Sequence, residues 1–563
     1  AKMSSDAAQH IVGKALSGVS FLASAQLLSR ALTFILNVAL TRHLDDASTL
    51  GVASVQLYLL YTIVLTLSRE GVRRTCLRVG APSGTASGNA DRANGSARTR
   101  SSMVNLTWIV VMGGLVLTTV FSWWFVAYAD VDALGTVSLD EYVDSILLIG
   151  VALVVELLSE PMFVAAQGQL QYGVRSFIEG AAVLGRCLVT VFAVVGLGLR
   201  LQAFALGYIA YSVILLGCYF AFFVRQVGDG KENEYGVWTL TSMRDLLPGN
   251  GLRITDGGIS TVAVSMSFQQ IWKLILAEGE KMVMVMLKME ASDLAVYALV
   301  FNLGSLVARF VFQPIEETAF AVFGKLNDIA GKMDSQNKDH HLSVGALVGT
   351  LCKTMCIIGL TFVTFGPSYS HLLLHLLYGN KWSNQTDAPR ALGVYCVYVL
   401  IIAVNGITEA FVHAIGDKKS LQDFNAWLFL FSLIYLGAAA VLLPFRAVGL
   451  ILANCINMGM RILFSTNFIL KWEDPVSKQR VDSIRQLCPS LQTLFAFSSS
   501  AVAVSVSETT VYHAFASWPR AGAHVAIGAV ALVSTFAFLV FVSEKKYVAN
   551  LRDLRRALAG KSG

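Results

Sequence analysis

Long apolar runs separated by short polar segments dominate the chain. About 20 consecutive apolar residues are needed to cross the hydrocarbon core of a bilayer as a helix. Runs of this length predict membrane-spanning helices, and we expect fourteen of them. They cover 18–40, 51–67, 104–128, 143–166, 177–198, 202–224, 263–287, 294–323, 343–369, 391–415, 425–443, 447–470, 490–507 and 521–543. The pattern therefore predicts an all-α polytopic membrane protein with fourteen transmembrane helices.

A weak internal repeat divides these spans into two halves. The segment that begins at Leu50 aligns with the segment that begins at Leu294 at a constant offset of 244 residues. This alignment places span 51–67 against span 294–323. Parallel repeats of helical bundles are typical of transporters. We therefore expect two six-helix bundles related by a pseudo-repeat, followed by two C-terminal helices.

Domain boundaries follow from this division. We expect an N-terminal lobe at 1–225, an inter-lobe cytosolic linker at 226–262 and a C-terminal lobe at 263–475. Residues 476–563 should hold the two extra helices and a basic cytosolic tail. Residues 81–102 are rich in Gly, Ala, Ser and Arg, a composition that predicts a disordered cytosolic loop.

Composition leaves no room for a large soluble domain. The 563-residue chain is 55% hydrophobic and only 14% charged, whereas soluble domains average about 25% charged residues. The net charge is +6. If both termini are cytosolic, the cytosolic segments hold 29 Lys and Arg residues and the opposite loops hold 7. This asymmetry follows the positive-inside rule, so the basic excess reflects topology and predicts no nucleic-acid partner.

The cysteines and the glycosylation sequon add little chemistry. None of the eight cysteines forms a CxxC motif, so we expect neither a metal site nor a disulfide framework. No P-loop is present, and we expect no cofactor. Asn384 begins an Asn-Gln-Thr sequon in a loop that the topology places on the far side of the membrane, where it could carry a glycan.

Seven basic residues fall within the predicted spans, where an ionised group costs from about 2.5 to over 10 kcal/mol unless it meets a partner or water. They are Arg30, Arg186, Lys273, Lys281, Arg309, Lys353 and Arg461. The first span of each half is unusually polar on one side. Its polar residues are Gln26, Arg30 and Asn37 in one half, and Gln269, Lys273, Glu278 and Lys281 in the other.

Helices of this kind are expected to line a central aqueous cavity. Its positive charge favours an anionic headgroup, and a diphosphate matches the geometry of Arg and Lys donors. The alternative is simple ion pairing, Lys281 with Glu278 or Lys273 with Glu280. The two alternatives carry similar weight at this point.

The stretch from Asn302 to Phe320 carries charged groups around a proline that should bend the helix. Arg309 and Glu316 lie seven residues apart with Gln313 between them, so one interpretation is an internal ion pair. The other is a cytosolic gate. Under the repeat, Glu316 and Glu317 correspond to a basic cluster in the first half, Arg69, Arg73 and Arg74. That cluster could instead only anchor to anionic headgroups.

Further polar residues recur at helical spacing in other spans. We interpret them as contacts between helices. They are Glu156 and Glu160 before Pro161, Asn405 and Glu409 in span 391–415, and Asn454, Asn457 and Arg461 in span 447–470.

Six blocks of sequence resemble the eukaryotic Rft family of the multidrug/oligosaccharidyl-lipid/polysaccharide exporter superfamily. They are TLSREGVRRTCL (66–77), ELLSEP (156–161), EGEKMVM (278–284), NLGSLVARFVFQPIEE (302–317), NGITEAF (405–411) and GLILANCINMGMRI (449–462). The resemblance implies a non-enzymatic role in the endoplasmic reticulum membrane, in N-linked glycosylation. Its cargo would be dolichol-diphosphate-linked Man5GlcNAc2, moved from the cytosolic to the lumenal leaflet with alternating access.

Three other functions compete with that of a flippase. A cation-coupled drug antiporter needs an acidic group deep in the first bundle, and span 18–40 offers Arg30 and no Asp or Glu. A glycosyltransferase could use Asp45 and Asp46, but their loop is short and no lumenal domain accompanies it. A non-transporting binder or chaperone of the same lipid would need the same cavity, so the sequence leaves it open beside the flippase.

Overall fold

The computed structural model describes residues 32–44, 46–79, 89–169, 171–228, 242–248, 257–330, 344–473, 486–513, 517–545, 547 and 549. Gln26, Arg30 and Asp45 lie outside this part of the chain. Two compact units form, Ala1–Ala295 and Val296–Gly563. The division lies further along the chain than the predicted lobe boundary at residue 263, so the helix at 257–286 belongs to the first unit by its contacts.

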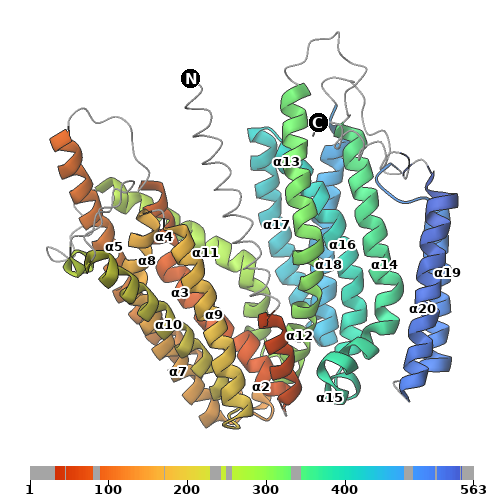
Figure 1. Cartoon of the computed structure of the whole chain (residues 1–563), viewed down its shortest axis with the longest axis horizontal. Helices are drawn as coiled ribbons and strands as arrows, with labels where there is room; N and C mark the ends of the chain where they lie inside the picture. The colour runs from red at the N-terminus through yellow and green to blue at the C-terminus, as the bar shows by residue number, and fades with distance from the viewer. Residues whose placement is uncertain are drawn as a thin grey trace. The chain divides into compact units, whose positions relative to one another are not determined.

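Helices make up the described part of the first unit (Figure 1). They are α2 (Ala47–Gly51), η1 (Val52–Leu57), α3 (Tyr58–Leu65), η2 (Thr66–Glu70), α4 (Gly71–Val79), α5 (Asn89–Ala127), α6 (Val131–Leu134), α7 (Leu139–Leu157), α8 (Glu160–Gly168), α9 (Tyr172–Val195), α10 (Leu201–Gly228), η3 (Met243–Leu246) and α11 (Gly257–Met286). Helix α10 packs against both α7 and α9, and α11 packs against α4.

The second unit continues from α12 (Ala291–Val307), which begins in the first. Its elements are η5 (Ala308–Phe312), α13 (Gln313–Ala330), α14 (Val344–Tyr378), α15 (Asn380–Asn384), α16 (Ala388–Ile415), α17 (Lys418–Leu442), η7 (Leu443–Phe445), α18 (Arg446–Lys471), α19 (Leu491–Ser507), η9 (Glu508–Tyr512), α20 (Trp518–Phe538) and η10 (Leu539–Ser543). Helix α16 packs against α13, α14 and α18, and α19 and α20 form a hairpin whose first helix contacts α14.

Eleven helical segments of the described residues are long and apolar enough to cross a membrane. This confirms an all-helical, multi-pass membrane protein, while the number fourteen stays a prediction. Spans 425–443 and 447–470 fall within one segment, Lys418–Lys471, which contains α17 and α18. Helix α11 exists where span 263–287 was expected but is not among the eleven. Most of span 18–40 lies outside the described residues.

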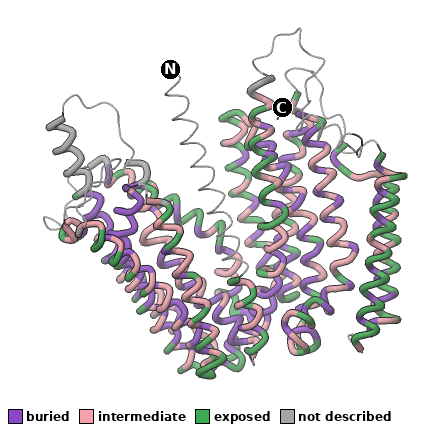
Figure 2. Tube along the Cα trace, in the orientation of Figure 1, coloured by how far each residue is buried: buried purple, intermediate pink, exposed green. Residues whose placement is uncertain are grey.

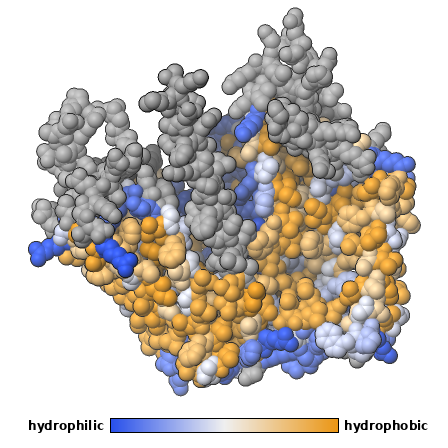
Figure 3. Space-filling model, viewed as in Figure 1, coloured by the Kyte–Doolittle hydropathy of each residue, from blue (hydrophilic) through white to orange (hydrophobic). Residues whose placement is uncertain are grey.

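Large apolar side chains remain exposed on the outer helices. On α19, α20 and η10, for example, Phe495, Val530 and Phe541 are 67–75% exposed, and exposed residues run along this hairpin in Figure 2. The face drawn in Figure 3 is largely apolar over both units, with hydrophilic residues gathered toward its upper and lower edges. Apolar surface of this extent is unfavourable in water and suits a lipid environment.

The expected disordered loop at 81–102 is partly wrong. Residues from Asn89 onward are helical, because α5 starts there and runs without interruption into the apolar span ending at Ala127. The apolar part of the span supplies the costly helix nucleus, and the Ala and Arg residues before it favour extension. Residues 81–88 lie outside the described part of the chain.

The two spans that the expected repeat aligns each contain a π-helical segment. One is η2, Thr66–Glu70, and the other is η5, Ala308–Phe312. The repeat offset places them at nearly corresponding positions. In the second, Pro314 lies two residues after the end of the segment and has no N–H to continue the α-helical ladder. A π segment widens the winding and turns the residues after it to a new face, and such segments often accompany functional sites.

Candidate functional site

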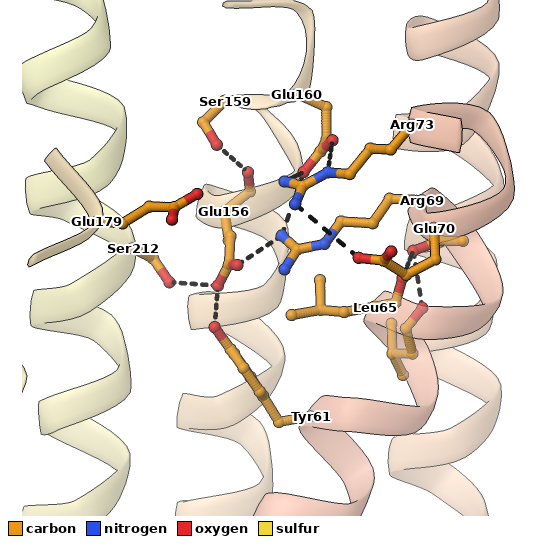
Figure 4. A network of polar contacts seen from close by, with 12 residues as sticks. Tyr61, Leu65, Arg69, Glu70, Arg73, Glu156, Ser159, Glu160, Glu179 and Ser212 are labelled. Atoms are coloured by element: carbon orange, nitrogen blue, oxygen red, sulfur yellow. Dashed lines mark hydrogen bonds and ion pairs between the residues drawn. The ribbon is translucent and has the colours of Figure 1, made fainter. Parts of the chain in front are cut away.

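A buried ion network joins η2, α4, α7 and α8 of the first unit (Figure 4). Arg69 on η2 donates from Nη1 to Glu156 on α7 at 2.6 Å and to Glu160 on α8 at 3.1 Å. Arg73 on α4 binds Glu160 through Nε at 2.8 Å and Nη2 at 2.5 Å. Both carboxylates are only 1% exposed. Each buried charge in this network therefore has an opposite charge within hydrogen-bonding distance.

The break between α7 and α8 positions the two carboxylates. Helix α7 ends at Leu157, and α8 begins at Glu160 with Pro161 in its first turn. Neutral donors complete the network around Glu156, which accepts hydrogen bonds from the hydroxyls of Tyr61 and Ser212. The Arg73 guanidinium also lies over the Phe163 ring, 3.5 Å from its centroid, in cation–π geometry.

The network changes the interpretation of the proposed gate. Arg69 and Arg73 have carboxylate partners within their own unit, and Arg74 is exposed. The sequence predicts contacts between helices for Glu156 and Glu160 without indicating these arginines as their partners. They join α7 and α8 to the span that carries the arginines, so an ion network holds the helices together. A gate pairing these arginines with Glu316 and Glu317 stays a prediction.

Helix α11 carries the basic residues expected to hold an anionic headgroup. Lys281 Nζ lies 2.6 Å from Glu278 and 4.2 Å from the centroid of the Tyr58 ring. The Tyr58 hydroxyl donates to the same Glu278 at 3.1 Å. Lys281 therefore forms the ion pair with Glu278 that the sequence left open as an alternative to binding a headgroup. Lys273 differs, because it is exposed and forms no ion pair with any described residue.

Two further residues on the polar sides of the first spans show no contact with other described residues that would indicate a binding site. Gln269 on α11 and Asn37 are both exposed.

Arg186 is a basic residue within a span for which the sequence indicates no specific role. The Arg186 guanidinium of α9 lies 3.7 Å from the centroid of the Tyr208 ring and has no carboxylate partner among the described residues. Its position in an apolar span was the signal that could have singled it out.

A pocket of about 650 Å³ lies within the second unit, between α13, α16 and α18. Three of its lining side chains are carboxylates, Glu316, Glu317 and Glu409, against one guanidinium, Arg461. Asn405 and His413 complete its polar lining. The carboxylates thus outnumber the cation in this pocket, and none of the described residues expected to form the basic central cavity lines it.

Glu409 and Arg461 form the central ion pair of this pocket. Arg461 Nε and Nη2 bind the two oxygens of Glu409 at 2.5 and 2.6 Å, a planar two-bond geometry that gives both strength and orientation. Glu316 lies against Gly406 on α16, where a Cβ would stand 1.8 Å from Glu316 Oε1. Only glycine therefore permits this approach.

The expected pair between Arg309 and Glu316 does not form. Arg309 is exposed and forms no ion pair with a described residue. It lies inside η5, whose wider winding turns Glu316 away from the face that seven-residue α-helical spacing predicts. Gln313 instead donates to Glu317 at 2.8 Å.

Three predicted polar residues lie outside the pocket. Asn454 Nδ2 donates to the Leu450 carbonyl on its own helix at 3.2 Å, whereas Asn457 Oδ1 is buried without a hydrogen-bond partner in the described structure. The sequon residue Asn384 is exposed at the end of α15 and accepts from His371 at 2.6 Å. Its glycosylation stays a prediction.

Comparison with known proteins identifies the family. The family model described as "Rft protein" matches residues 14–553. The chain belongs to the Rft family. It is similar to the Man(5)GlcNAc(2)-PP-dolichol translocation protein RFT1 of Dictyostelium discoideum, at 30% identity over 98% of both chains. It is also similar to the protein of that name from Xenopus tropicalis, at 32% identity over 97% of both chains.

A solved structure shares the fold of this Rft-family chain. The lipid II flippase MurJ in an inward closed conformation aligns with a TM-score of 0.57 and 10% sequence identity. The alignment covers 92% of this chain and 98% of MurJ. The likeness shows a common helical architecture.

The blocks that resemble the Rft family supply the polar sites of both units. Blocks 66–77 and 156–161 contribute the two arginines and two glutamates of the first-unit network. Blocks 302–317, 405–411 and 449–462 contribute Glu316, Glu409 and Arg461 to the second-unit pocket. The resemblance therefore rests on residues that form one cluster in each unit. Within each cluster, the residues come from segments that are far apart in the sequence.

Proposed function

We propose that this protein is a translocation factor for dolichol-diphosphate-linked Man5GlcNAc2 in the endoplasmic reticulum membrane, acting in N-linked glycosylation without catalysing a covalent reaction. The observation that supports this most directly is similarity over 97–98% of the chain to proteins named for that translocation. The flippase fold of MurJ supports a transport architecture. The excess of basic residues in one set of loops supports a topology with both termini cytosolic.

The diphosphate would be bound by cations of the first unit, with Arg30, Lys273 and Lys281 as the proposed ligands. Lys273 is the best placed of the described residues, since it is exposed and unpaired with any described carboxylate. Lys281 would have to share its charge between Glu278 and the ligand. A Lys ammonium is a compact point charge suited to phosphate oxygens. The central cavity expected from the sequence stays a prediction.

Reconstitution tests the proposal. Purified protein in liposomes should move a radiolabelled dolichol-diphosphate oligosaccharide across the bilayer faster than protein-free liposomes do. The variant Lys273→Ala should weaken binding of that lipid at least ten-fold, which corresponds to about 1.4 kcal/mol. Lys288→Ala is the matched control, because Lys288 already pairs with Asp130 at 3.0 Å in a connecting segment.

Two outcomes separate translocation from the alternative. Movement no faster than in empty vesicles, with binding retained, would reject translocation and favour a non-transporting binder or chaperone of the same lipid. Equal lipid affinity in the Lys273→Ala variant and the wild type would remove Lys273 from the headgroup site while leaving the transport measurement intact.

A further inference from the structure

The charge of the second-unit pocket restricts what it can bind. Three carboxylates line it, and the one guanidinium among its lining residues, Arg461, is already bound to Glu409. Glu316 and Glu317 therefore add uncompensated negative charge. Juxtaposing like charges costs several kcal/mol at an interface. A diphosphate is consequently a poor occupant of this pocket.

Asn405 provides an independent sign of a ligand. The residue is 6% exposed and lines the pocket, and its Oδ1 has no hydrogen-bond partner in the described structure. A buried polar atom left without a partner costs about 1–3 kcal/mol. Such atoms in native proteins call for an explanation, and a donor group supplied by a ligand is one. The carboxylates beside Asn405 are also acceptors, so the pocket as a whole requires donors.

The size and apolar lining of the pocket favour an organic ligand over a bare ion. Its volume of about 650 Å³ lies in the range of small-molecule sites, about 300–1,000 Å³. Phe320, Ile402 and Met458 provide apolar surface between the polar groups. A sugar matches this combination, because its hydroxyls donate to carboxylate and amide oxygens while its C–H faces pack on apolar side chains.

We propose that this pocket binds the neutral glycan of the lipid-linked cargo, with Glu316 and Asn405 accepting hydrogen bonds from sugar hydroxyls. This inference rests on the proposed function. It assigns the two parts of the cargo to different sites. Cations of the first unit would bind the diphosphate, and the acidic pocket of the second unit would bind the sugars. Glu317 and Glu409 extend the acceptor surface, and Arg461 fixes Glu409 in place through its two-bond contact.

Binding of the soluble glycan tests the inference. Detergent-purified full chain is titrated with lipid-free Man5GlcNAc2, and the dissociation constant is measured by saturation-transfer NMR. The variants Glu316→Gln and Asn405→Leu should each weaken binding at least ten-fold. Asp423→Asn removes an exposed carboxylate on α17 of the same unit and should leave affinity unchanged. Thermal unfolding of each variant establishes that it is folded.

The outcomes distinguish this inference from the proposed function. Three results would overturn the glycan site, even if liposomes show transbilayer movement. They are a wild type that does not bind the glycan, folded variants that bind it with wild-type affinity, and pyrophosphate that competes with the glycan. Glycan binding that depends on Glu316 and Asn405 would support the site even if movement is absent. In that second case the protein would bind its cargo without translocating it.

Discussion

The spans that carry Arg69 and Glu316 correspond to each other in the repeat expected from the sequence, but their charged groups have different partners. Each span contains a π-helical segment: η2 includes Arg69, and η5 ends at Phe312, four residues before Glu316. In the first unit, two arginines bind two glutamates that are almost fully buried. In the second, Glu316 and Glu317 lie in a pocket where the one guanidinium belongs to another carboxylate.

A buried ion network in the first unit contrasts with a pocket in the second unit that we propose binds the glycan. A buried, mutually neutralised network fixes the relative positions of α4, α7 and α8, and removing any member leaves an orphan charge. A pocket with surplus acceptors keeps part of its hydrogen-bonding capacity free for a ligand. Substitutions in the ion network should therefore affect mainly stability, and substitutions in the pocket should affect mainly glycan binding.

The largest effect is expected from Glu160→Ala in the first unit. Arg73 would lose both of its short contacts and Arg69 would lose one, leaving buried positive charge without its partner. Breaking a buried ion pair in this way costs about 3–5 kcal/mol. The midpoint of thermal unfolding in detergent measures the loss.

Glu179→Ala is the control for that experiment. Glu179 pairs with Arg175 at 2.9 Å in the same unit, but both side chains are about a third exposed, at 37% and 32%. Exposed pairs contribute about 1 kcal/mol or less. Similar losses in Glu160→Ala and Glu179→Ala would contradict the structural role of the network.

A smaller loss is expected from Arg461→Ala in the second unit. The variant leaves Glu409 without its two-bond partner, but the side chains of Arg461 and Glu409 are 24% and 14% exposed, so water can reach Glu409. We expect a loss of about 1–3 kcal/mol, measured by the same unfolding assay. A loss as large as that of Glu160→Ala would mean that the two ion pairs are equally structural, and the contrast between the units would fail.

Gly406→Ala should alter the pocket with little change in stability. The added Cβ would meet the end of the flexible Glu316 side chain, which can rotate away. Alanine also raises helix propensity by about 1 kcal/mol over glycine, so the net change should stay within about 1 kcal/mol. Glycan affinity should nevertheless fall, because Glu316 is displaced.

Gly459→Ala on α18 is the matched control for Gly406→Ala. Its added Cβ would meet no atom within 4 Å, so stability should rise slightly and glycan affinity should not change. If both alanine variants bind the glycan as the wild type does, the position of Glu316 against Gly406 has no role in binding.

The sequence predicted the helical architecture well because a single physical rule governs it. A bilayer of fixed thickness requires about 20 apolar residues per span, and most predicted spans coincide with helices. Helix α11 shows the limit of this rule. Its charged residues lower its apolar character, so it is a long helix that composition alone does not mark as a span.

The pairing of side chains could not be predicted in the same way. Helical spacing shows which residues share a face, but it does not show which helix packs on that face. Arg69 and Glu156 lie 87 residues apart, and their contact depends on how α7 and η2 pack. The prediction that Arg309 and Glu316 share a helix face was wrong, because α-helical spacing does not hold across the π segment at Ala308–Phe312.

The smallest expected effect concerns Asp46, which caps α2 of the first unit outside the membrane. Burial alone would raise the pKa of this carboxyl, but hydrogen bonds from Thr136 and Ser48 and the charge of Arg200 outweigh burial and lower the pKa below 3.8. A carboxyl with a lowered folded-state pKa stabilises the fold above its unfolded pKa, and this stabilisation is lost as the pH falls through the folded value.

Asp46→Asn keeps a good capping residue and removes the charge, so it should cost less than about 1 kcal/mol at pH 7. The difference in unfolding midpoint between variant and wild type should shrink as the pH falls below 4. A difference that stays constant from pH 7 to pH 3 would show that the charge of Asp46 contributes nothing, and that capping alone holds the start of α2.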